Sequence, residues 1–288
     1  MQHIAALMTC FNRREKTLAC LESLFSQPLP DGYGLHVFLV DDGSTDGTDE
    51  AVQARFPTAA TVIRGNGNLF WNGGMRAAMG VAMLQGFNFY LWMNDDTQLF
   101  PGALNDLLAT HNILCKQLGK DSIVVGSICD PLSGKTSYGG RVRSNRWQPL
   151  YYSLVEPGDE PFPCDSMNGN CVLIPASAAQ AVGNLEAAFV HSMGDWDYGY
   201  RATALGIPIY VAPGHVGECH NDARARDARA NLQTVRDHWR KVTGPKGLPF
   251  HAWMVYTRRH AGPFWPLYWI KPYVMAVMTG LGSGSSKK

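Results

Sequence analysis

The sequence has almost no net charge and no long uninterrupted apolar run. Its 288 residues include 25 basic and 24 acidic side chains, which leaves a formal charge of +1. Such a balanced chain has no overall field that would gather nucleic acid, so we expect no nucleic-acid partner, and a phosphate group would have to be held by local side chains. A membrane-spanning helix needs about 18 or more consecutive apolar residues. The most apolar stretch, residues 263–281, is interrupted by Lys271 and three prolines.

The sequence also lacks paired cysteines and a secretory leader. Its seven cysteines follow no CxxC pattern and no regular spacing, which predicts reduced thiols and a cytoplasmic location. The residues after Met1 enter an apolar run that has none of the charged and cleavage regions of a signal peptide. Apolar residues, glycine and tryptophan are abundant: 45% of the residues are hydrophobic, and there are 30 glycines and eight tryptophans. This composition excludes intrinsic disorder and indicates tight loops beside a ligand.

The first half of the chain alternates short apolar runs with amphipathic segments. Expected strands cover residues 4–9, 36–40, 61–63, 89–93 and 123–126, and expected helices cover residues 14–26, 48–56, 74–85 and 101–119. This alternation predicts an α/β fold, with a Rossmann-like, mostly parallel sheet flanked by helices on both faces. Because ligands of such sheets bind beyond the carboxyl ends of the strands, the residues that follow each strand become site candidates.

The second half is less regular. From about residue 131, glycine, serine, arginine and aromatic residues indicate hairpins or a loop. The expected elements after them are strands 171–174 and 209–212 and helices 176–182, 196–205 and 227–242. Irregular second halves of this kind commonly build the wall of a binding site in α/β proteins.

Two adjacent acids follow the strand expected over residues 36–40. Carboxylates at the end of a buried strand are electrostatically costly without a partner, and Asp41 and Asp42 are suited to accept hydrogen bonds from a nucleobase N–H and from ribose hydroxyls. Residues 46–48, just downstream, are better explained by turn and helix-cap hydrogen bonds.

A second acidic group follows the strand expected over residues 89–93. Asp95 and Asp96, preceded by Asn94, offer the oxygen ligands that a hard cation such as Mg²⁺ or Mn²⁺ prefers and that it shares with substrate phosphates. The alternative is a helix N-cap, which Thr97 could provide alone. A cation here would neutralise a diphosphate leaving group, which this nearly neutral chain cannot do through its overall field.

A loop rich in glycine and asparagine, residues 65–76, leads into the helix expected at 74. Its backbone N–H groups and the Arg76 guanidinium are suited to a phosphate or to sugar hydroxyls. The loop matches neither the GxGxxG dinucleotide fingerprint nor a P-loop. Farther on, Asp195 beside Trp196 is suited to act as a general base on an acceptor hydroxyl, with a helix cap as the alternative. Asp197 and Arg201 predict a structural ion pair at i, i+4 spacing.

Together with Thr9-Cys10-Phe11-Asn12-Arg13, these segments resemble the inverting family 2 nucleotide-sugar glycosyltransferases of the GT-A fold over residues 3–220. The resemblance implies that the first acidic pair binds the nucleotide, that residues 94–96 are the DXD metal motif and that residues 194–197 are the ED-type motif carrying the base. The donor-binding residues implied in this way are Thr9, Asn12, Arg13, Asp41, Asp42, Asn72, Gly74, Arg76, Asn94 and Asp95.

The sequence departs from the family pattern at three places. The DXD position begins with Asn94, so metal binding is assigned chiefly to Asp96, and Asp95 is placed near the sugar or ribose. Gly194 replaces the first acid of the ED pair, which leaves Asp195 as the only candidate base there. Many relatives complete the metal site with a histidine after the last strand. His215 and His220 both follow it here, and His220 is taken as the second candidate ligand.

The resemblance implies a catalytic domain over residues 1–222, with a nucleotide-sugar-binding half to residue 130 and an acceptor-binding half from 131, then a helical extension over 223–281 and a flexible tail over 282–288. The implied reaction is a metal-dependent, inverting transfer from a nucleotide sugar to a hydroxyl of a glycan or polyprenyl-linked acceptor in bacterial cell-surface polysaccharide synthesis. The loop over 65–76 is similar to that of rhamnosyltransferase-like members and favours dTDP-rhamnose over UDP- or GDP-sugars. A nucleotidyltransferase and a non-catalytic sugar-nucleotide-binding domain are the alternatives.

The extension is rich in aromatic residues and cations. Residues 249–281 combine three tryptophans and three tyrosines with two arginines and Lys271. Aromatic and cationic side chains together suit the headgroup level of an anionic membrane, which predicts peripheral contact with the inner face of the cell membrane. A helical flap on the catalytic domain and the seam of a homodimer are alternatives of equal standing.

Overall fold

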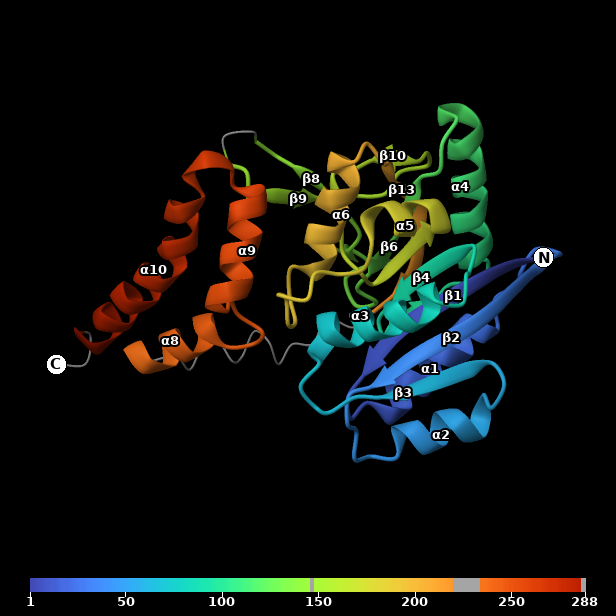
Figure 1. Ribbon diagram of the computed structural model, residues 1–288, viewed down its shortest axis with the longest axis horizontal. Coiled ribbons are helices and arrows are strands. Elements are labelled where there is room, and N and C mark those ends of the chain that lie inside the picture. Colours follow the sequence, from blue (N-terminus) through green and yellow to red (C-terminus); the bar gives the residue numbers. More distant parts are fainter. Residues whose placement is uncertain (146–147, 220–233, 286–288) are drawn as a thin grey trace.

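The computed structural model describes residues 1–145, 148–219 and 234–285, and it places a large twisted sheet between two layers of helices (Figure 1). The strands of the first half are β1 (Gln2–Cys10), β2 (Tyr33–Asp41), β3 (Ala60–Arg64), β4 (Phe89–Met93), β5 (Gln98–Leu99) and β6 (Ile123–Cys129). The helices between them are α1 (Arg14–Phe25), α2 (Thr48–Arg55), α3 (Phe70–Met83) and α4 (Ala103–Leu118). The predicted alternation is confirmed.

The second half completes the sheet and adds a small one. Its strands are β7 (Thr136–Tyr138), β8 (Gly140–Arg143), β9 (Tyr152–Leu154), β10 (Phe162–Pro163), β11 (Ser166–Met167), β12 (Cys171–Pro175) and β13 (Ile209–Glu218), and its first helices are α5 (Ala176–Val182) and α6 (Gly194–Ala204). The main sheet has the order β10-β13-β6-β12-β4-β1-β2-β3, and β11-β8-β9 form the small sheet. The strands β4, β1, β2 and β3 are parallel, whereas β12 runs antiparallel between β4 and β6. The sheet is therefore mostly parallel, as expected.

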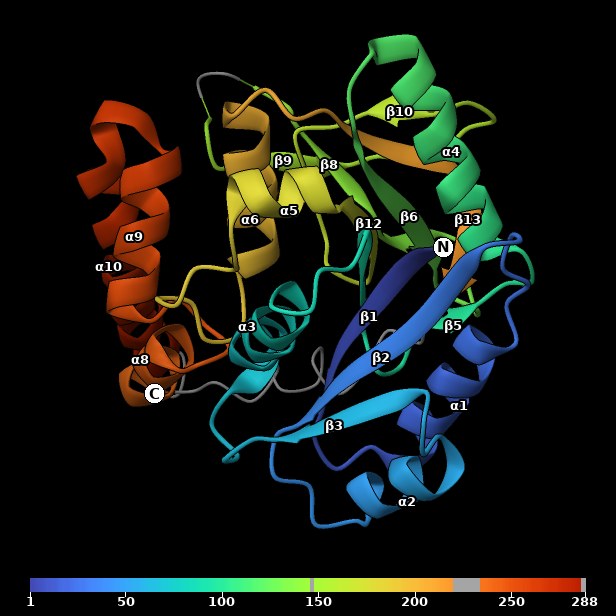
Figure 2. The same cartoon turned by 45° about the vertical axis from the view of Figure 1, so that its right-hand side comes forward.

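Both faces of the sheet are buried. Along β1, Ile4, Ala6 and Met8 join a core cluster with α1 and α4, while Ala5 and Leu7 join a second cluster with α3, α5 and α6. Figure 2 shows the two groups of helices on opposite sides of the strands. A strand buried on both faces needs apolar residues at every position, which explains its continuous apolar sequence.

Two expected elements are longer than the sequence indicated. Helix α3 begins at Phe70 and not at residue 74. Gly73 and Gly74 therefore lie inside the helix, although glycine disfavours a helix interior. Strand β13 continues to Glu218 and not to residue 212, because register shifts after Val211 and His215 absorb the interrupting segment and restore the pairing with β6. Of the helix expected over 227–242, only α8 (Val235–Thr243) falls within the described residues.

Three helices follow the sheet: α8, α9 (Phe250–His260) and α10 (Trp265–Ser285), with a 3₁₀ turn η1 (Gly262–Phe264) before the last. In Figure 1, α9 stands between α6 and α10, and α10 is the outermost element on that side. Tyr256 and Ala252 of α9 pack on Phe189 and Met193 in a third apolar cluster, which fastens the extension beside α6. Among the described residues, no helix is long and apolar enough to cross a membrane.

Candidate active site

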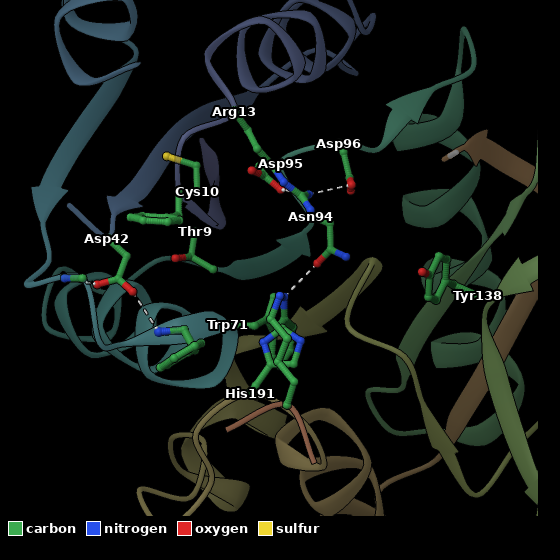
Figure 3. Close-up of a pocket in the computed structure, with 14 residues that line it drawn as sticks. Thr9, Cys10, Arg13, Asp42, Trp71, Asn94, Asp95, Asp96, Tyr138 and His191 are labelled. Atoms are coloured by element: carbon green, nitrogen blue, oxygen red, sulfur yellow. Dashed lines mark hydrogen bonds and ion pairs between the residues drawn. The ribbon is translucent and has the colours of Figure 1, made fainter. Parts of the chain in front are cut away.

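A cavity of about 490 Å³ opens at the carboxyl ends of β1, β2 and β4 (Figure 3). Fourteen residues line it: Thr9, Cys10, Phe11, Arg13, Asp42, Gly67, Phe70, Trp71, Asn94, Asp95, Asp96, Tyr138, His191 and Lys246. The predicted donor-site residues among them are Thr9, Arg13, Asp42, Asn94 and Asp95, together with the predicted metal ligand Asp96. These side chains come together because the carboxyl ends of neighbouring parallel strands share one edge of the sheet.

The Arg13 guanidinium lies between the two acids that follow β4. Its Nη1 is 3.2 Å from Asp95 Oδ1 and 2.8 Å from Asp96 Oδ2, as the dashed lines in Figure 3 show. The two carboxylates are nearly buried, whereas 38% of the Arg13 side chain is exposed to the cavity. A cation thus already sits where two negative charges meet, and its exposed part faces the space that a ligand would fill.

Asp95 and Asp96 have the chemistry of a divalent-metal site. Asp95 Oδ2 is buried and has no hydrogen-bond partner. Burial raises the pKa of Asp95 to about 7, against the lowering effect of Arg13 and with a smaller contribution from the charge of Asp96. Mg²⁺ and Mn²⁺ commonly bind one or two protein carboxylates and take their other ligands from phosphates and water. The pair fits such an ion, although the described residues contain no group of three or more His, Cys, Asp and Glu placed to hold a metal.

The histidine predicted to complete the metal site, His220, lies outside the described residues. Its alternative, His215, faces another part of the structure, because its Nε2 is 2.8 Å from Thr136 Oγ1. The residue before His220, Cys219, forms a hydrogen bond with Asp96. The chain directly after β13 therefore approaches Asp96.

The first acidic pair organises the loops that border the cavity. Asp42 accepts hydrogen bonds from the backbone N–H groups of Gly67 and Phe70, each at 2.9 Å, so both of its oxygens hold the glycine-rich loop. Asp41 is buried and accepts from Ser44 N at 2.7 Å, outside the cavity. Asp46 accepts from the N–H of Arg14 and from Thr48, which confirms its interpretation as a turn and cap residue.

Asn12 also lies outside the cavity lining and ties two loops together. Its N–H donates to Ser44 Oγ, and its side-chain oxygen accepts from Thr45 N at 2.8 Å. Asn12, Phe70 and Met193 have positive φ values of 51°, 52° and 75°. Such strain is rare in residues with side chains, and here it occurs after β1, at the start of α3 and before α6, in the loops that surround the cavity.

Asp195 is not among the residues that line the cavity, and its side chain is partly exposed. Its two oxygens accept from Gly169 N at 3.1 Å and from Trp196 N at 2.9 Å. Gly169 lies beside both Asp195 and the cavity residue Trp71, since a Cβ on Gly169 would overlap the Trp71 ring and lie 3.5 Å from Asp195 Cβ. Burial raises the pKa of Asp195, which suits a carboxylate that has to accept a proton near neutral pH.

Trp71 connects this region to the acidic group. Its Nε1 donates to Asn94 Oδ1 at 2.8 Å, so the amide of the DXD-like segment is used to position an indole (Figure 3). The side-chain oxygen of Asn94 is therefore used in a contact within the protein.

Helix α3 places two predicted donor residues, Asn72 and Arg76, in structural contacts. Asn72 is buried and donates to the backbone oxygens of Glu186 and Phe189. Arg76 donates to Leu185 O at 3.1 Å. A Cβ on Gly194 would lie 1.7 Å from Asn72 Oδ1, so the position that carries an acid in the family motif has no room for a side chain here. These contacts hold the segment before α6 against α3.

Gly74 allows α3 to approach β1, and its replacement is our first prediction. A Cβ on Gly74 would lie 2.2 Å from Thr9 Oγ1. We expect Gly74→Ala to displace Thr9 from the cavity wall, to destabilise the fold by about 1–3 kcal/mol through overpacking, and to weaken nucleotide binding. The measurements are chemical denaturation and calorimetric titration with the donor nucleotide.

Gly80 in the same helix provides the control. A Cβ there would meet only Asn184 Nδ2, at 3.4 Å. Gly80→Ala should therefore be neutral or stabilising by about 0.5–1 kcal/mol, since alanine is the better helix former. Equal stability and equal nucleotide affinity of the two variants would contradict the importance of the close approach.

A buried ionic cluster lies next to Asp195. The Asp197 side chain is completely buried, and its carboxylate contacts Arg201 at 2.8 Å, Arg259 at 2.7 Å and His260 at 2.9 Å. Burial by itself would raise the pKa of Asp197, but hydrogen bonds from His260 and Arg259 and the charge of Arg201 bring it below its usual value. The predicted pair with Arg201 is confirmed. Arg259 and His260 were not foreseen, because they come from α9.

Three further cavity residues had no signal in the sequence. Tyr138, His191 and Lys246 line the cavity from β7, from the loop before α6 and from the loop between α8 and α9. Burial together with the charges of Lys246 and Arg13 lowers the pKa of His191 to about 4, so its imidazole is neutral at physiological pH. Cys10 also lines the cavity, and burial with the nearby charges of Asp41 and Asp95 raises the pKa of its thiol, which argues against a nucleophilic role.

Residues 5–169 match the family model described as glycosyl transferase family 2. The chain belongs to this family. This family 2 glycosyltransferase is similar to the N-acetylglucosaminyl-diphospho-decaprenol L-rhamnosyltransferase of Mycobacterium tuberculosis. The two sequences are 24% identical over 239 residues, which cover 76% of this chain and 75% of the relative.

Solved structures give the same fold for this family 2 glycosyltransferase. A mannosyltransferase from Pyrobaculum calidifontis, in complex with GDP-Man and Mn²⁺, matches with a TM-score of 0.54 and 15% identity over 99% of this chain and 75% of that one. TarS from S. aureus matches with a TM-score of 0.56 and 13% identity, covering 96% and 81%. GalNAc-T7 with UDP, GalNAc and Mn²⁺ matches with a TM-score of 0.58 and 12% identity, covering 77% of this chain and 44% of that one. The fold is GT-A, as expected.

Proposed function

We propose that this glycosyltransferase moves a sugar, with inversion, from a nucleotide-diphosphate donor to a hydroxyl of a glycan or polyprenyl-linked acceptor in bacterial cell-surface polysaccharide synthesis. The observation that carries the proposal is the arrangement of Arg13 between Asp95 and Asp96 at the mouth of a cavity whose other end is bordered by Asp42. The volume of this cavity, about 490 Å³, suits a nucleotide sugar. The named activity of the mycobacterial relative supports rhamnose as the transferred sugar and dTDP-rhamnose as the donor.

The donor would lie along the carboxyl edge of the sheet. Asp42 and the loop that it holds would face the nucleoside, because this carboxylate and the Gly67 backbone border the β2 end of the cavity. The diphosphate would lie at the β4 end, beside the cations of Arg13 and Lys246. Guanidinium and ammonium groups are the usual protein partners of phosphate oxygens.

Asp95 and Asp96 would hold Mg²⁺ or Mn²⁺, with Asp96 as the chief ligand and His220 as the further candidate from the sequence. The orphaned oxygen of buried Asp95 supports a cation partner, and two of the structurally similar glycosyltransferases were solved with Mn²⁺. When bound, such an ion neutralises the negative charge that grows on a departing diphosphate.

Asp195 would take the proton of the acceptor hydroxyl. As the acceptor oxygen forms its bond to the anomeric carbon, the bond from that carbon to the diphosphate oxygen breaks, and the proton passes to the Asp195 carboxylate. Hydrogen bonds from the N–H groups of Gly169 and Trp196 hold this carboxylate in one orientation. Arg141 lies over the Trp196 ring at 4.8 Å, which gives the acceptor side an aromatic wall. No protein nucleophile is required for a single displacement.

The acceptor is proposed to be carried by lipid at the cytoplasmic face of the membrane. The mycobacterial relative is named for a diphospho-decaprenol acceptor, which supports this class. Packed aromatic side chains connect the residue beside the base to the extension, from Trp196 to the buried Tyr256 with ring centroids 6.5 Å apart, and from Tyr256 to Trp253 at 5.7 Å.

A donor screen tests the proposal. The full chain is incubated with dTDP-, UDP- and GDP-sugars in Mg²⁺, in Mn²⁺ or in EDTA, and release of nucleoside diphosphate is measured with and without a lipid-diphosphate acceptor. We expect cation-dependent release, fastest from dTDP-rhamnose. Release of pyrophosphate from a nucleoside triphosphate and a sugar phosphate would instead identify a nucleotidyltransferase, and no turnover with any donor would overturn the proposal.

Replacing Lys246 tests whether the helical extension contributes to donor binding, because Lys246 lines the cavity from the loop between α8 and α9. Loss of a hydrogen bond to a charged group costs about 1.5–3 kcal/mol, so Lys246→Gln should raise the KM for the donor by about tenfold or more. Lys241→Gln is the matched control, because Lys241 is exposed on α8 and does not line the cavity. Equal KM values for the two variants would remove Lys246 from the diphosphate site.

A further inference from the structure

Helix α10 has an apolar face that none of the described residues covers. Six apolar side chains along it are between 41% and 65% exposed: Leu267, Ile270, Val274, Met275, Met278 and Leu281. Their spacing of three and four residues places them along one side of the helix. We call these six residues the outer face of α10. In Figure 1, α10 is the element farthest from the sheet on that side of the molecule.

The opposite, inner face of α10 packs against the rest of the helical extension. Tyr273 and Ala276 are buried, the Tyr273 hydroxyl donates to Leu248 O, and Gly280 packs so closely on Val235 of α8 that a Cβ would lie 2.4 Å from its Cα. A helix that is apolar all round is ordinarily buried all round. The inner face of α10 meets this expectation, whereas its outer face has no partner among residues 1–145, 148–219 and 234–285.

The extension also concentrates positive charge. Residues 234–281 contain seven arginines and lysines and a single acid, Asp237, which leaves 18 basic and 23 acidic residues in the rest of the chain. Lys271 is exposed and lies among the outer-face residues, and Arg258 is exposed on α9. The nearly neutral chain is therefore divided into a basic helical unit and an acidic remainder.

We infer that the outer face of α10 docks on an anionic lipid bilayer, with the helix lying in the plane of the interface. Charge complementarity decides between a bilayer and a second copy of this chain. Docking two outer faces on each other would bring two strongly basic units together, whereas an anionic surface attracts them. Because its inner face packs on α8, α10 meets lipid on one side only. Lys271 would extend its ammonium to the headgroups while its methylenes stay among apolar side chains.

With α10 in this orientation, a lipid-linked acceptor could approach the protein from the bilayer. This part of the inference rests on the proposed function. A groove of about 540 Å³ opens between α9, α10 and residues 148–151. It shares Met275 with the outer face and is also lined by Lys271. Trp253 lines this groove and stacks on Tyr256, which contacts Trp196 beside the proposed base. An acceptor whose hydrocarbon chain remains in the bilayer could thus place its polar end in this groove, beside Trp253.

The test compares two triple variants of the full chain by co-sedimentation with phosphatidylcholine vesicles, with and without phosphatidylglycerol. The first variant, Leu267→Gln, Val274→Gln and Met278→Gln, alters the outer face. The second, Leu84→Gln, Leu132→Gln and Leu205→Gln, alters three equally apolar residues that are 58% to 89% exposed elsewhere. We expect wild type and the second variant to bind vesicles that contain phosphatidylglycerol, and to bind them more weakly at high salt. The first variant should bind these vesicles at least about tenfold more weakly than wild type.

Donor hydrolysis without vesicles accompanies each measurement, so that loss of docking and failure of the proposed function are separate results. The first variant should hydrolyse donor like wild type, which also shows that it is folded. Equal sedimentation of the two variants, or binding unaffected by phosphatidylglycerol, would overturn the inference. A wild-type dimer in light scattering that the first variant abolishes, without vesicle binding, would assign the face to a second copy and overturn it as well.

Discussion

Replacing Asp195 with Asn is expected to reduce sugar transfer by about two to four orders of magnitude, the usual contribution of a general base. Nucleotide binding should be nearly unchanged, because Asp195 is not among the residues that line the cavity. The amide can keep the hydrogen bond from Trp196 N, so the loop should remain in place. The measurements are initial rates with saturating donor and calorimetric titration with the nucleoside diphosphate.

Asp159→Asn is the matched control, since this acid is exposed and distant in sequence from every cavity residue. It should retain wild-type rates. If Asp195→Asn lost nucleotide binding together with activity, Asp195 would belong to the donor site, and its assignment as base would be overturned.

The pH dependence of transfer follows from the same residue. The base has to be ionised to accept a proton, and burial raises the pKa of Asp195. Activity should therefore fall as the pH falls through this raised pKa, giving an acidic limb above the value of about 3.9 that is normal for aspartate. A pH–rate profile at saturating donor measures it, and an acidic limb at the ordinary aspartate value would contradict the raised pKa.

Replacing Asp197 with Ala is expected to lower the free energy of unfolding by about 3–5 kcal/mol, because it leaves buried cations without their counter-charge. Arg201, Arg259 and His260 all contact this one carboxylate. The pKa of Asp197 is below its usual value, so its contribution to stability is present near neutral pH and is lost as the pH falls through that lowered pKa. Urea denaturation at neutral and acidic pH measures both effects.

Glu22→Ala is the control for this comparison. Glu22 pairs with Arg55 at 2.9 Å, but both side chains are about half exposed, at 45% and 56%. Removing such a surface pair should cost no more than about 1 kcal/mol. If Asp197→Ala proves too unstable to purify, Arg259→Gln, which leaves Arg201 and His260 in place, should show a smaller loss. Costs for Asp197→Ala and Glu22→Ala within error of each other would contradict a stabilising role for the cluster.

Much of the fold was predictable from the sequence because its signals are local. Strand β4 and helix α5 have the expected bounds, and most other strands and helices of the first half begin and end within a few residues of them. A strand buried on both faces has an apolar sequence whichever way its neighbours run, so the antiparallel direction of β12 had no signal. The start of α3 was misplaced because glycine propensity opposed a helix that packing on Thr9 stabilises.

The site was predictable only in part. The sequence placed Arg13, Asp42, Asp95 and Asp96 at strand ends, and the structure gathers them around one cavity. It could not distinguish them from Asn72 and Arg76, whose side chains point to backbone oxygens of residues more than 100 positions away. A residue's type shows what it can bind, whereas its direction depends on the packing of the helix that carries it.

The sequence by itself determined the family, the parallel order of the first strands and the acids that end them, because these depend on neighbours along the chain. Only the tertiary structure decided that Arg13 lies between Asp95 and Asp96, that Lys246 reaches the cavity from the extension, and that Arg259 and His260 join Asp197. The nearly neutral total charge concealed a basic extension and an acidic remainder. Electrostatic interactions and packing contacts depend on the distance between side chains in space. Only the fold brings residues that are far apart in the chain close together.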